Sequence, residues 1–312
     1  MSELLNPFDT FTIPLGAWVQ TLVDWMTLHF RPAFQVMRWP VAHMLDSLTS
    51  ILTSVPQSIF LICLFFVTWQ LARLRMAVIC TASLAFLGAI GIWPDTMTTL
   101  ALILTAVIFS IAIGLPLGIL AGRNDRAEAF LHPLLDIMQT LPAFVYLVPI
   151  VMLVGIGNVP GVIITIVFAI PPIIRLTSLG IRGVPPSIVE AAYAFGSSDW
   201  QVLWKVQIPL AIRSIRLGVN QTLMMALAMV TYASMIAVEG LGLLVLRGIG
   251  RLDVGLASLG GIGIVMLAII LDRLSQALAV ASRERRMFWR TSPLGILARL
   301  FSSEKHKKSV RA

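Results

Sequence analysis

The sequence has little charge, and its charged residues avoid the long apolar runs. Only 12% of the 312 residues are Asp, Glu, Lys or Arg, whereas soluble domains carry about 25%, and 58% are hydrophobic. This composition excludes an ordinary soluble domain and predicts an all-α membrane protein. The formal net charge is +8, but the basic residues gather at segment ends and in the tail, which is typical of topology signals. No nucleic-acid partner is therefore expected, whereas the lipid bilayer is.

Residues that build catalytic and metal sites are also scarce. The two cysteines, Cys63 and Cys80, lie inside apolar runs, and the four histidines are scattered, so no metal site is expected. No Ser/His or His/Asp pairing lies within the apolar segments, so we expect no catalytic site in this chain. The phosphate-binding pattern G-x-x-x-x-G-K-[ST] is missing, because Lys205 is the only lysine before residue 305 and follows Trp204.

The apolar runs predict membrane-spanning helices. A spanning helix needs about 20 mostly apolar residues, and about seven segments approach this requirement. They are Val55–Leu71, Met76–Trp93, Met97–Ala121, Leu134–Val154, Val159–Leu176, Leu217–Val238 and Val254–Leu271. We therefore expect a polytopic helical bundle. Its acidic residues avoid the middles of the spans, whereas an ion-coupled carrier usually buries such residues near the midplane.

The basic residues orient this bundle. Arginines follow the first, third, fifth and seventh predicted spans (Arg73 and Arg75; Arg123 and Arg126; Arg175 and Arg182; Arg273, Arg283, Arg285 and Arg286). The intervening turns at 94–95 and 155–158 carry none, and only Arg247 and Arg251 break the alternation. Because basic loops stay in the cytoplasm, the N-terminus is predicted outside and the C-terminus inside.

The chain divides into four predicted regions. Residues 1–54 contain two amphipathic stretches, Ile13–Phe30 and Val41–Thr53, which we interpret as helices lying in the membrane interface, with a soluble tail as the alternative. Residues 55–96 hold the first two spans, residues 97–276 form a core, and residues 277–312 form a basic cytoplasmic tail.

Residues 182–212, on the cytoplasmic side of the core, differ from the rest because they are amphipathic. Pro185 and Pro186 suit a helix start. A narrow apolar face follows at helical spacing, formed by Ile188, Ala191, Ala192 and Phe195. This pattern fits either a loop that folds onto its own bundle or a docking element for a soluble partner.

A second helix is predicted after a turn at Gly196, which suits a left-handed helix end. Ser198 is a suitable N-cap. The helix would carry Trp200, Leu203 and Trp204 on one face and end at Pro209.

The spacing in this segment resembles a known motif. Glu190-Ala191-Ala192, three residues, Gly196, nine residues and then Val206-Gln-Ile208-Pro209 resemble the EAA loop of ABC-importer permease subunits, in which Ile-x-Leu-Pro ends the pattern. Stretches such as IMQTLPAFVYLVPIVMLVGIGNVPGV and AIPPIIRLTSLGIRGVPP extend the resemblance to glycine betaine/proline betaine importers, from about Asn6 to Arg290. Glu239 departs from it, because glycine is expected there.

The resemblance implies a type I ABC-importer transmembrane domain in the bacterial inner membrane, working by alternating access. Its implied partners are a second copy of the chain, two cytoplasmic ATPase subunits that use ATP and Mg²⁺, and an extracytoplasmic substrate-binding protein. The chain itself would bind no cofactor and catalyse no reaction. The implied docking residues are Glu190, Ala191, Ala192 and Gly196, with Pro209 setting the return into the next span.

The implied substrates are glycine betaine and proline betaine, while choline, carnitine and trimethylamine N-oxide stay open as alternatives. A route without charge in mid-membrane suits a zwitterion. The candidate lining residues are Phe144, Tyr146, Asn220, Gln221, Met224 and Tyr232, each of which could instead serve ordinary packing. An ion-coupled carrier working alone and a membrane scaffold or osmosensor are the alternative functions.

Overall fold

The computed structural model describes residues 14–71 and 74–279, and all regular structure in these ranges is helical. The predicted all-α class is therefore confirmed. Most of the predicted basic tail lies outside the described residues.

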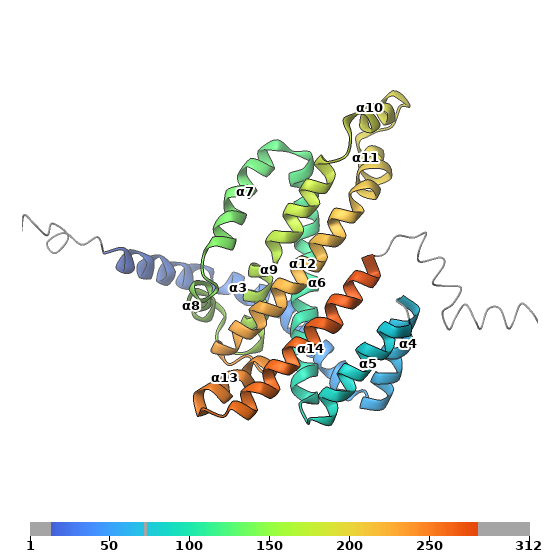
Figure 1. The fold of residues 1–312 in the computed structure, drawn as a ribbon. Helices are drawn as coiled ribbons and strands as arrows, with labels where there is room; N and C mark the ends of the chain where they lie inside the picture. The colour runs from blue at the N-terminus through green and yellow to red at the C-terminus, as the bar shows by residue number, and fades with distance from the viewer. Residues whose placement is uncertain (1–13, 72–73, 280–312) are drawn as a thin grey trace, which may run out of the picture.

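The helices follow one another with short connections (Figure 1). They are α3 (Leu15–Ser54), α4 (Gln57–Leu71), α5 (Leu74–Ala89), α6 (Trp93–Arg123), α7 (Asp125–Thr140), α8 (Ala143–Val154), α9 (Asn158–Arg182), α10 (Pro186–Ala194), α11 (Asp199–Val202), the π-helix η1 (Leu203–Gln207), α12 (Ile208–Ala233), the 3-10 helix η2 (Ser234–Ile236), α13 (Leu241–Arg251) and α14 (Val254–Ala279).

The centre of the bundle is α9, which packs between α6 and α12. Small residues allow this close approach. A Cβ at Gly118 of α6 would lie 2.6 Å from the Cβ of Thr177 and 2.9 Å from the carbonyl oxygen of Ile174, both on α9. On the other side, a Cβ at Gly180 of α9 would lie 2.8 Å from that of Ser214 on α12. Such approaches between helices are typical of membrane bundles, where packing replaces the hydrophobic effect.

The number of spans is smaller than predicted. Among the described residues, four helical segments are long and apolar enough to cross a membrane alone, or up to six if each of two bent pairs counts as one span. They are Trp93–Arg123, Asn158–Arg182, Asp199–Ile236 and Val254–Ala277. The predicted span Met76–Trp93 corresponds mainly to α5, which has only 16 residues.

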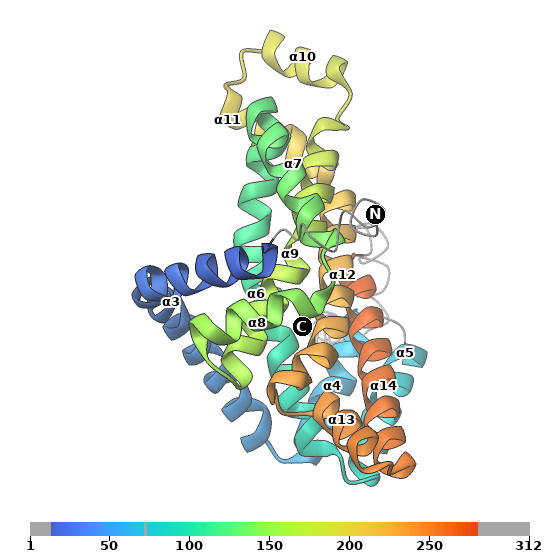
Figure 2. The ribbon, with the colours of Figure 1, turned by 90° about the vertical axis from the view of Figure 1, so that its left-hand side faces the viewer.

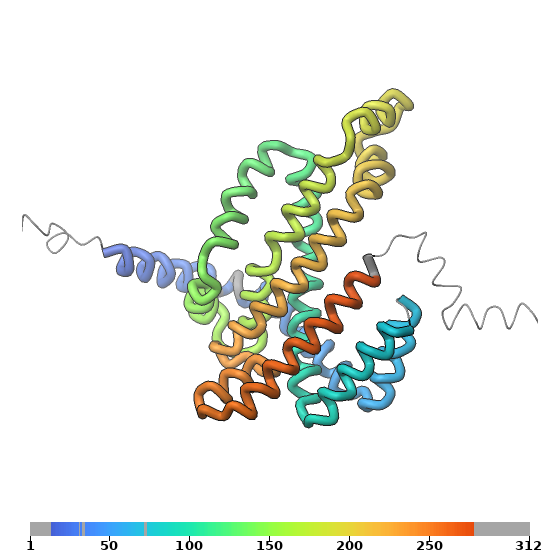
Figure 3. Tube along the Cα trace, in the orientation of Figure 1, coloured from blue at the N-terminus to red at the C-terminus, as the bar shows by residue number. Residues whose placement is uncertain are grey.

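The predicted fourth span, Leu134–Val154, is not one straight helix. It is split between α7 and α8, which meet at an angle of 100° (Figure 3). Leu141 at the break has an extended backbone, with ψ of 133°. The cause is Pro142, because a proline ring disfavours helical geometry in the residue before it.

The N-terminal region forms one helix instead of the two that the sequence predicts. α3 is 40 residues long and runs through Pro32 and Pro40. Its axis changes direction (Figure 2), which prolines within a helix permit. Val41 and Leu45 in its second half are buried in the core, whereas Trp18 in its first half is exposed. Its placement at a membrane interface stays a prediction.

Replacing Gly118 with alanine tests the packing of α6 on α9. We expect a loss of about 1–3 kcal/mol in stability, because the added methyl group overlaps with Thr177 and a backbone carbonyl. The measurement is the thermal unfolding midpoint of the purified protein in detergent. Gly261→Ala is the matched control, since a Cβ there meets nothing within 4 Å. Equal midpoints for the two variants would contradict the packing argument.

Candidate functional site

Residues 182–212 extend beyond the bundle at one end, and we call them the projecting segment. α10 and α11 lie at its tip, past the adjacent ends of α9 and α12 (Figures 1 and 2). No residue of α10 is buried. α10 therefore does not fold back onto its own bundle, which argues against one of the two alternatives left by the sequence.

The apolar face predicted on α10 is confirmed, and it is uncovered. Ile188, Ala191 and Phe195 are exposed, while Ala192 is half-buried. Phe195 at the helix end is 90% exposed, which is unusual for a phenyl group. Glu190 is also exposed. This end of the molecule presents a small apolar surface, with the short side chains of Ala191 and Ala192 at its centre.

The turn after α10 has the predicted left-handed geometry at Gly196, where φ is +78°. The N–H of Gly196 donates to the carbonyl oxygen of Tyr193 at 2.8 Å, and that of Ser197 donates to Ala192 at 3.1 Å. A Cβ at Gly196 would meet no atom within 4 Å. Glycine is therefore favoured here because it tolerates the positive φ, and not because a side chain would collide with another part of the chain.

Side chains fix the shape of this turn. Ser198 caps α11 as predicted, and the amide N–H of Ser198 in turn donates to the side-chain oxygen of Gln201 at 3.0 Å. The Tyr193 hydroxyl donates to Asp199 at 2.9 Å, and this hydrogen bond raises the pKa of Tyr193 because it stabilises the neutral phenol. Arg123, at the end of α6, lies 4.0 Å from Asp199. Because α10, α11 and α6 are linked in this way, the tip has a defined orientation.

The predicted second helix is wrong in two respects. Leu203 does not share a face with Trp200 and Trp204. It is buried in an apolar cluster with residues of α9 and α12, whereas both tryptophans are exposed and contact each other edge to face.

The helix also does not end at Pro209. It continues through η1 into α12, giving one helical segment from Asp199 to Ile236. A proline lacks an N–H and its ring clashes with the carbonyl group four residues earlier. The π-helix accommodates this, because the N–H of Ile208 reaches the carbonyl oxygen of Leu203, five residues back.

A line of exposed residues runs along α12. It consists of Leu217, Gln221, Met224, Ala228, Tyr232 and Met235, which recur every three or four positions. We call this line the α12 stripe. Phe144 of α8 contacts Tyr232 edge to face, with 5.3 Å between ring centroids. The structure thus places four of the six candidate lining residues, Phe144, Gln221, Met224 and Tyr232, on one surface.

The other two candidate lining residues, Asn220 and Tyr146, form hydrogen bonds with other parts of the chain. The side-chain oxygen of Asn220 accepts a hydrogen bond from the hydroxyl group of Ser275 on α14. The Tyr146 hydroxyl donates to the carbonyl oxygen of Met138 at 2.9 Å, across the bend between α7 and α8. Both bonds serve helix packing.

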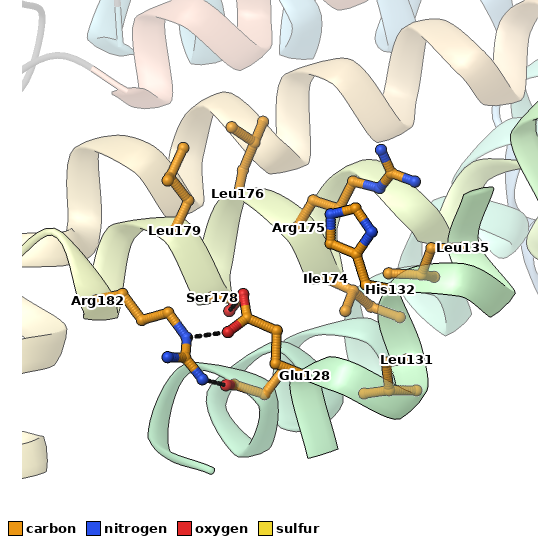
Figure 4. Close-up of a pocket in the computed structure, with 11 residues that line it drawn as sticks. Glu128, Leu131, His132, Leu135, Ile174, Arg175, Leu176, Ser178, Leu179 and Arg182 are labelled. Carbon is orange, nitrogen blue, oxygen red and sulfur yellow. Dashed lines mark hydrogen bonds and ion pairs between the residues drawn. The ribbon is translucent and has the colours of Figure 1, made fainter. Parts of the chain in front are cut away.

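A cavity of about 240 Å³ between α7 and α9 was not anticipated from the sequence (Figure 4). The guanidinium group of Arg182 forms ion pairs with the carboxylates of Glu128 and Asp125, at 2.5 and 2.7 Å. Arg175 bonds Asp136 at 2.5 Å. Asp125, Glu128, His132 and Asp136 recur at helical spacing, and this signal would have marked α7 as a charged helix and not as the start of an apolar span.

Comparisons with known proteins agree with this geometry. The family model for the inner membrane component of binding-protein-dependent transport systems matches residues 114–284. The glycine betaine/proline betaine transport system permease protein ProW of Escherichia coli (strain K12) is 56% identical over 96% of this chain and 85% of the relative. The glycine betaine/carnitine transport permease protein GbuB of Listeria monocytogenes is 43% identical over 85% of this chain and 95% of the relative.

The fold is similar to that of a chain from the MetNI methionine ABC transporter, solved in inward-facing conformations. The TM-score is 0.53 at 22% identity, covering 65% of this chain and 96% of that chain. The family match spans the region that contains α9, the projecting segment and α12. The chain therefore belongs to the family of inner membrane components of binding-protein-dependent transport systems.

Proposed function

We propose that this chain is the permease subunit of an ATP-driven importer for glycine betaine and related osmoprotectants such as proline betaine, and that it forms the transport route by alternating access. The substrate class is supported by relatives of 56%, 43% and 39% identity, all of which are named as glycine betaine permeases. The observation that carries the proposal is the uncovered apolar face of α10 next to the turn at Gly196.

The projecting segment is the point where energy enters. Burial of Phe195 and Ile188 against a partner removes apolar surface from water, which is favourable. The small side chains of Ala191 and Ala192 allow the partner surface to approach closely. Glu190 adds a charged contact at the rim of this surface. The partner is a cytoplasmic ATPase, which binds ATP and Mg²⁺ and performs the hydrolysis. This chain binds neither and has no catalytic role.

Pro209 contributes by fixing the return path. The π-helix before it joins α11 to α12 without a break, and Leu203 is buried in an apolar cluster that also includes residues of α9 and α12. A displacement of the tip is therefore transmitted to α12 and not absorbed by a flexible loop. Such rigid-body motion is the usual basis of alternating access.

The arginines orient the protein. Arg123, Arg182 and Arg213 all lie at or near the end of the bundle that carries the projecting segment. Because basic residues stay on the cytoplasmic side, this end faces the cytoplasm, the C-terminus lies inside and the N-terminus lies outside the bacterial inner membrane. The opposite end receives substrate from an extracytoplasmic binding protein.

The transport route lies along the α12 stripe, between two copies of the chain. Gln221 lies between the apolar residues Leu217 and Met224 of the α12 stripe, and a polar amide facing lipid tails is costly. The stripe is therefore better placed against the second copy and an aqueous route than against lipid. Phe144 and Tyr232 offer aromatic surfaces that attract a quaternary ammonium group. Asn220 and Tyr146 lie behind this surface.

Replacing Gly196 with valine or asparagine tests the role of the turn. Valine should abolish uptake of labelled glycine betaine by cells that lack other betaine transporters, because a β-branched residue does not tolerate a φ of +78°. Asparagine should retain much of the activity, since it enters the left-handed region more easily. Immunoblots of the membrane fraction control for insertion. Normal uptake by the valine variant would argue against this role of the turn.

A Phe195→Ala change tests docking of the ATPase. We expect about a tenfold or larger loss of ATPase that copurifies with the chain, because burying a phenyl side chain contributes about 1.5–3 kcal/mol. The matched control is Leu252→Ala, since Leu252 is also 90% exposed but directly follows α13, which lies at the opposite end of the bundle. Equal losses in both variants would show that α10 is not the docking surface.

Reconstitution in proteoliposomes tests the transported substrate and the source of energy. With its ATPase and binding protein, the chain should take up labelled glycine betaine only when ATP is supplied. Unlabelled proline betaine should compete, and choline, carnitine and trimethylamine N-oxide complete the comparison. Uptake by the chain alone under an ion gradient would indicate a carrier, and copurification without ATP-dependent uptake would indicate a scaffold.

A further inference from the structure

The start of α9 and the turn that follows α12 and η2 lie far from the projecting segment and are joined by two hydrogen bonds. The Nδ2 group of Asn158, the first residue of α9, donates to the Glu239 carboxylate at 3.1 Å. The backbone N–H of Glu239 donates back to Oδ1 of Asn158 at 2.9 Å. A backbone bond of 3.2 Å from Gly157 to Ile236 lies beside them. We call the two bonds between Asn158 and Glu239 the clasp.

The turn that carries Glu239 is also fixed to α6. The N–H of Leu241 donates to the hydroxyl oxygen of Thr99 at 2.9 Å. Gly240 leaves no room for a side chain there, since a Cβ would lie 2.3 Å from the same oxygen. Ala237 adopts a left-handed φ of 59°, which is uncommon for alanine. The turn 237–240 is thus held in one conformation by two helices.

Between the clasp and the projecting segment, α9 and α12 are in close contact along their length. Near the middle, a Cβ at Gly218 of α12 would lie 3.2 Å from the Cα of Ile173. Near the clasp, a Cβ at Gly161 would lie 2.2 Å from a methyl carbon of Val238. The two helices, the projecting segment at one end and the clasp at the other therefore form a closed frame.

Packing and hydrogen bonding resist different motions in this frame. Apolar contacts between helices permit small sliding displacements, the shear motions seen in many conformational changes. A pair of hydrogen bonds in opposite directions is more restrictive, because each bond requires a particular distance and angle. The clasp therefore opposes sliding of α9 along α12.

We propose that Asn158 and Glu239 are positioning residues that couple the two ends of the permease. By preventing slippage, the clasp makes α9, the projecting segment and α12 move as one body, so that a displacement of α10 reaches the turn 237–240. This inference rests on the proposed function, in which an ATPase displaces α10. Neither residue contacts the ATPase or the nucleotide in this scheme.

Asn158 is the central member of the clasp. Glycine, which the sequence resemblance predicts at position 239, would keep the backbone bond to Asn158 and lose only the carboxylate bond. Glu239 therefore adds a second bond to a link that the backbone already provides. Removal of the Glu239 side chain should weaken coupling less than a change at Asn158 that also repels Glu239.

The test exchanges the partners of the clasp. Asn158→Asp keeps an acceptor for the N–H of Glu239 but places a carboxylate against the Glu239 carboxylate, so the clasp should open. Adding Glu239→Gln to this variant restores a donor and an acceptor in the reversed order. Glu239→Gln alone keeps the acceptor for Asn158. All three chains are reconstituted with the ATPase and binding protein.

The measured quantity is the amount of labelled glycine betaine taken up per ATP hydrolysed. Asn158→Asp should lower this ratio by about threefold to tenfold, in the range that loss of a hydrogen bond produces. The double variant should return close to the ratio of the unchanged chain, as should Glu239→Gln alone. Glu239→Gly should fall between the two extremes.

Two results would overturn the inference. One is an unchanged ratio in Asn158→Asp, including a proportional fall of uptake and hydrolysis, which is what simple damage to the fold produces. The other is a double variant whose ratio stays as low as that of Asn158→Asp. Failure of the proposed function is distinguishable, because the unchanged chain would then show no ATP-dependent uptake.

Discussion

The close approach of α9 to both α6 and α12 is the constraint on which the rest of the structure depends. In a bilayer, apolar side chains gain little by leaving lipid, so helices must associate by fitting closely together. Gly118 and Gly180 allow this on opposite sides of α9, where side chains of ordinary size would collide with backbone or Cβ atoms. Because α9 is held on two sides, the segments at both of its ends inherit a fixed position.

Because α9 is rigidly held, the exposed tip of the projecting segment can transmit a displacement to the bundle. An apolar surface on a flexible loop would bind a partner without transmitting force, and a rigid helix that presents no such surface would have nothing to bind. The projecting segment combines both properties, since α10 leaves Phe195 uncovered while Leu203 is buried in an apolar cluster a short distance along the chain. The π-helix makes this combination possible, because it lets the helix continue past Pro209 and so connects the exposed tip rigidly to α12. Arg123 and Asp199 add a further link to α6.

Features with local causes could be predicted from the sequence, and features that depend on distant partners could not. The apolar face of α10 and the turn at Gly196 follow from residues within one or two helical turns, and both predictions are confirmed. Pro209 was misjudged because the π-helix that lets the helix continue past it is a rare element that the local sequence pattern does not indicate. The break at Pro142 follows from the proline itself, which interrupts the predicted fourth span, whereas the 100° angle between α7 and α8 does not follow from the local sequence. Asn158 and Glu239 meet across 81 positions, which no local pattern reveals.

The distribution of charge fits the proposed function, in which partner subunits supply the energy for transport. Among the described residues, the charged side chains lie mostly towards the ends of the apolar helices, a distribution that fits the proposed ATP-driven permease better than an ion-coupled carrier. The charged contacts of the bundle join helices near their ends, as Arg182 joins α9 to α7 and Asn158 with Glu239 joins α9 to the segment after α12. Polar bonds at the ends and close packing in the middle make a body that moves as a unit. In the proposed function, such a body suits a route through which a zwitterion passes without being held, while a partner outside the membrane supplies the energy.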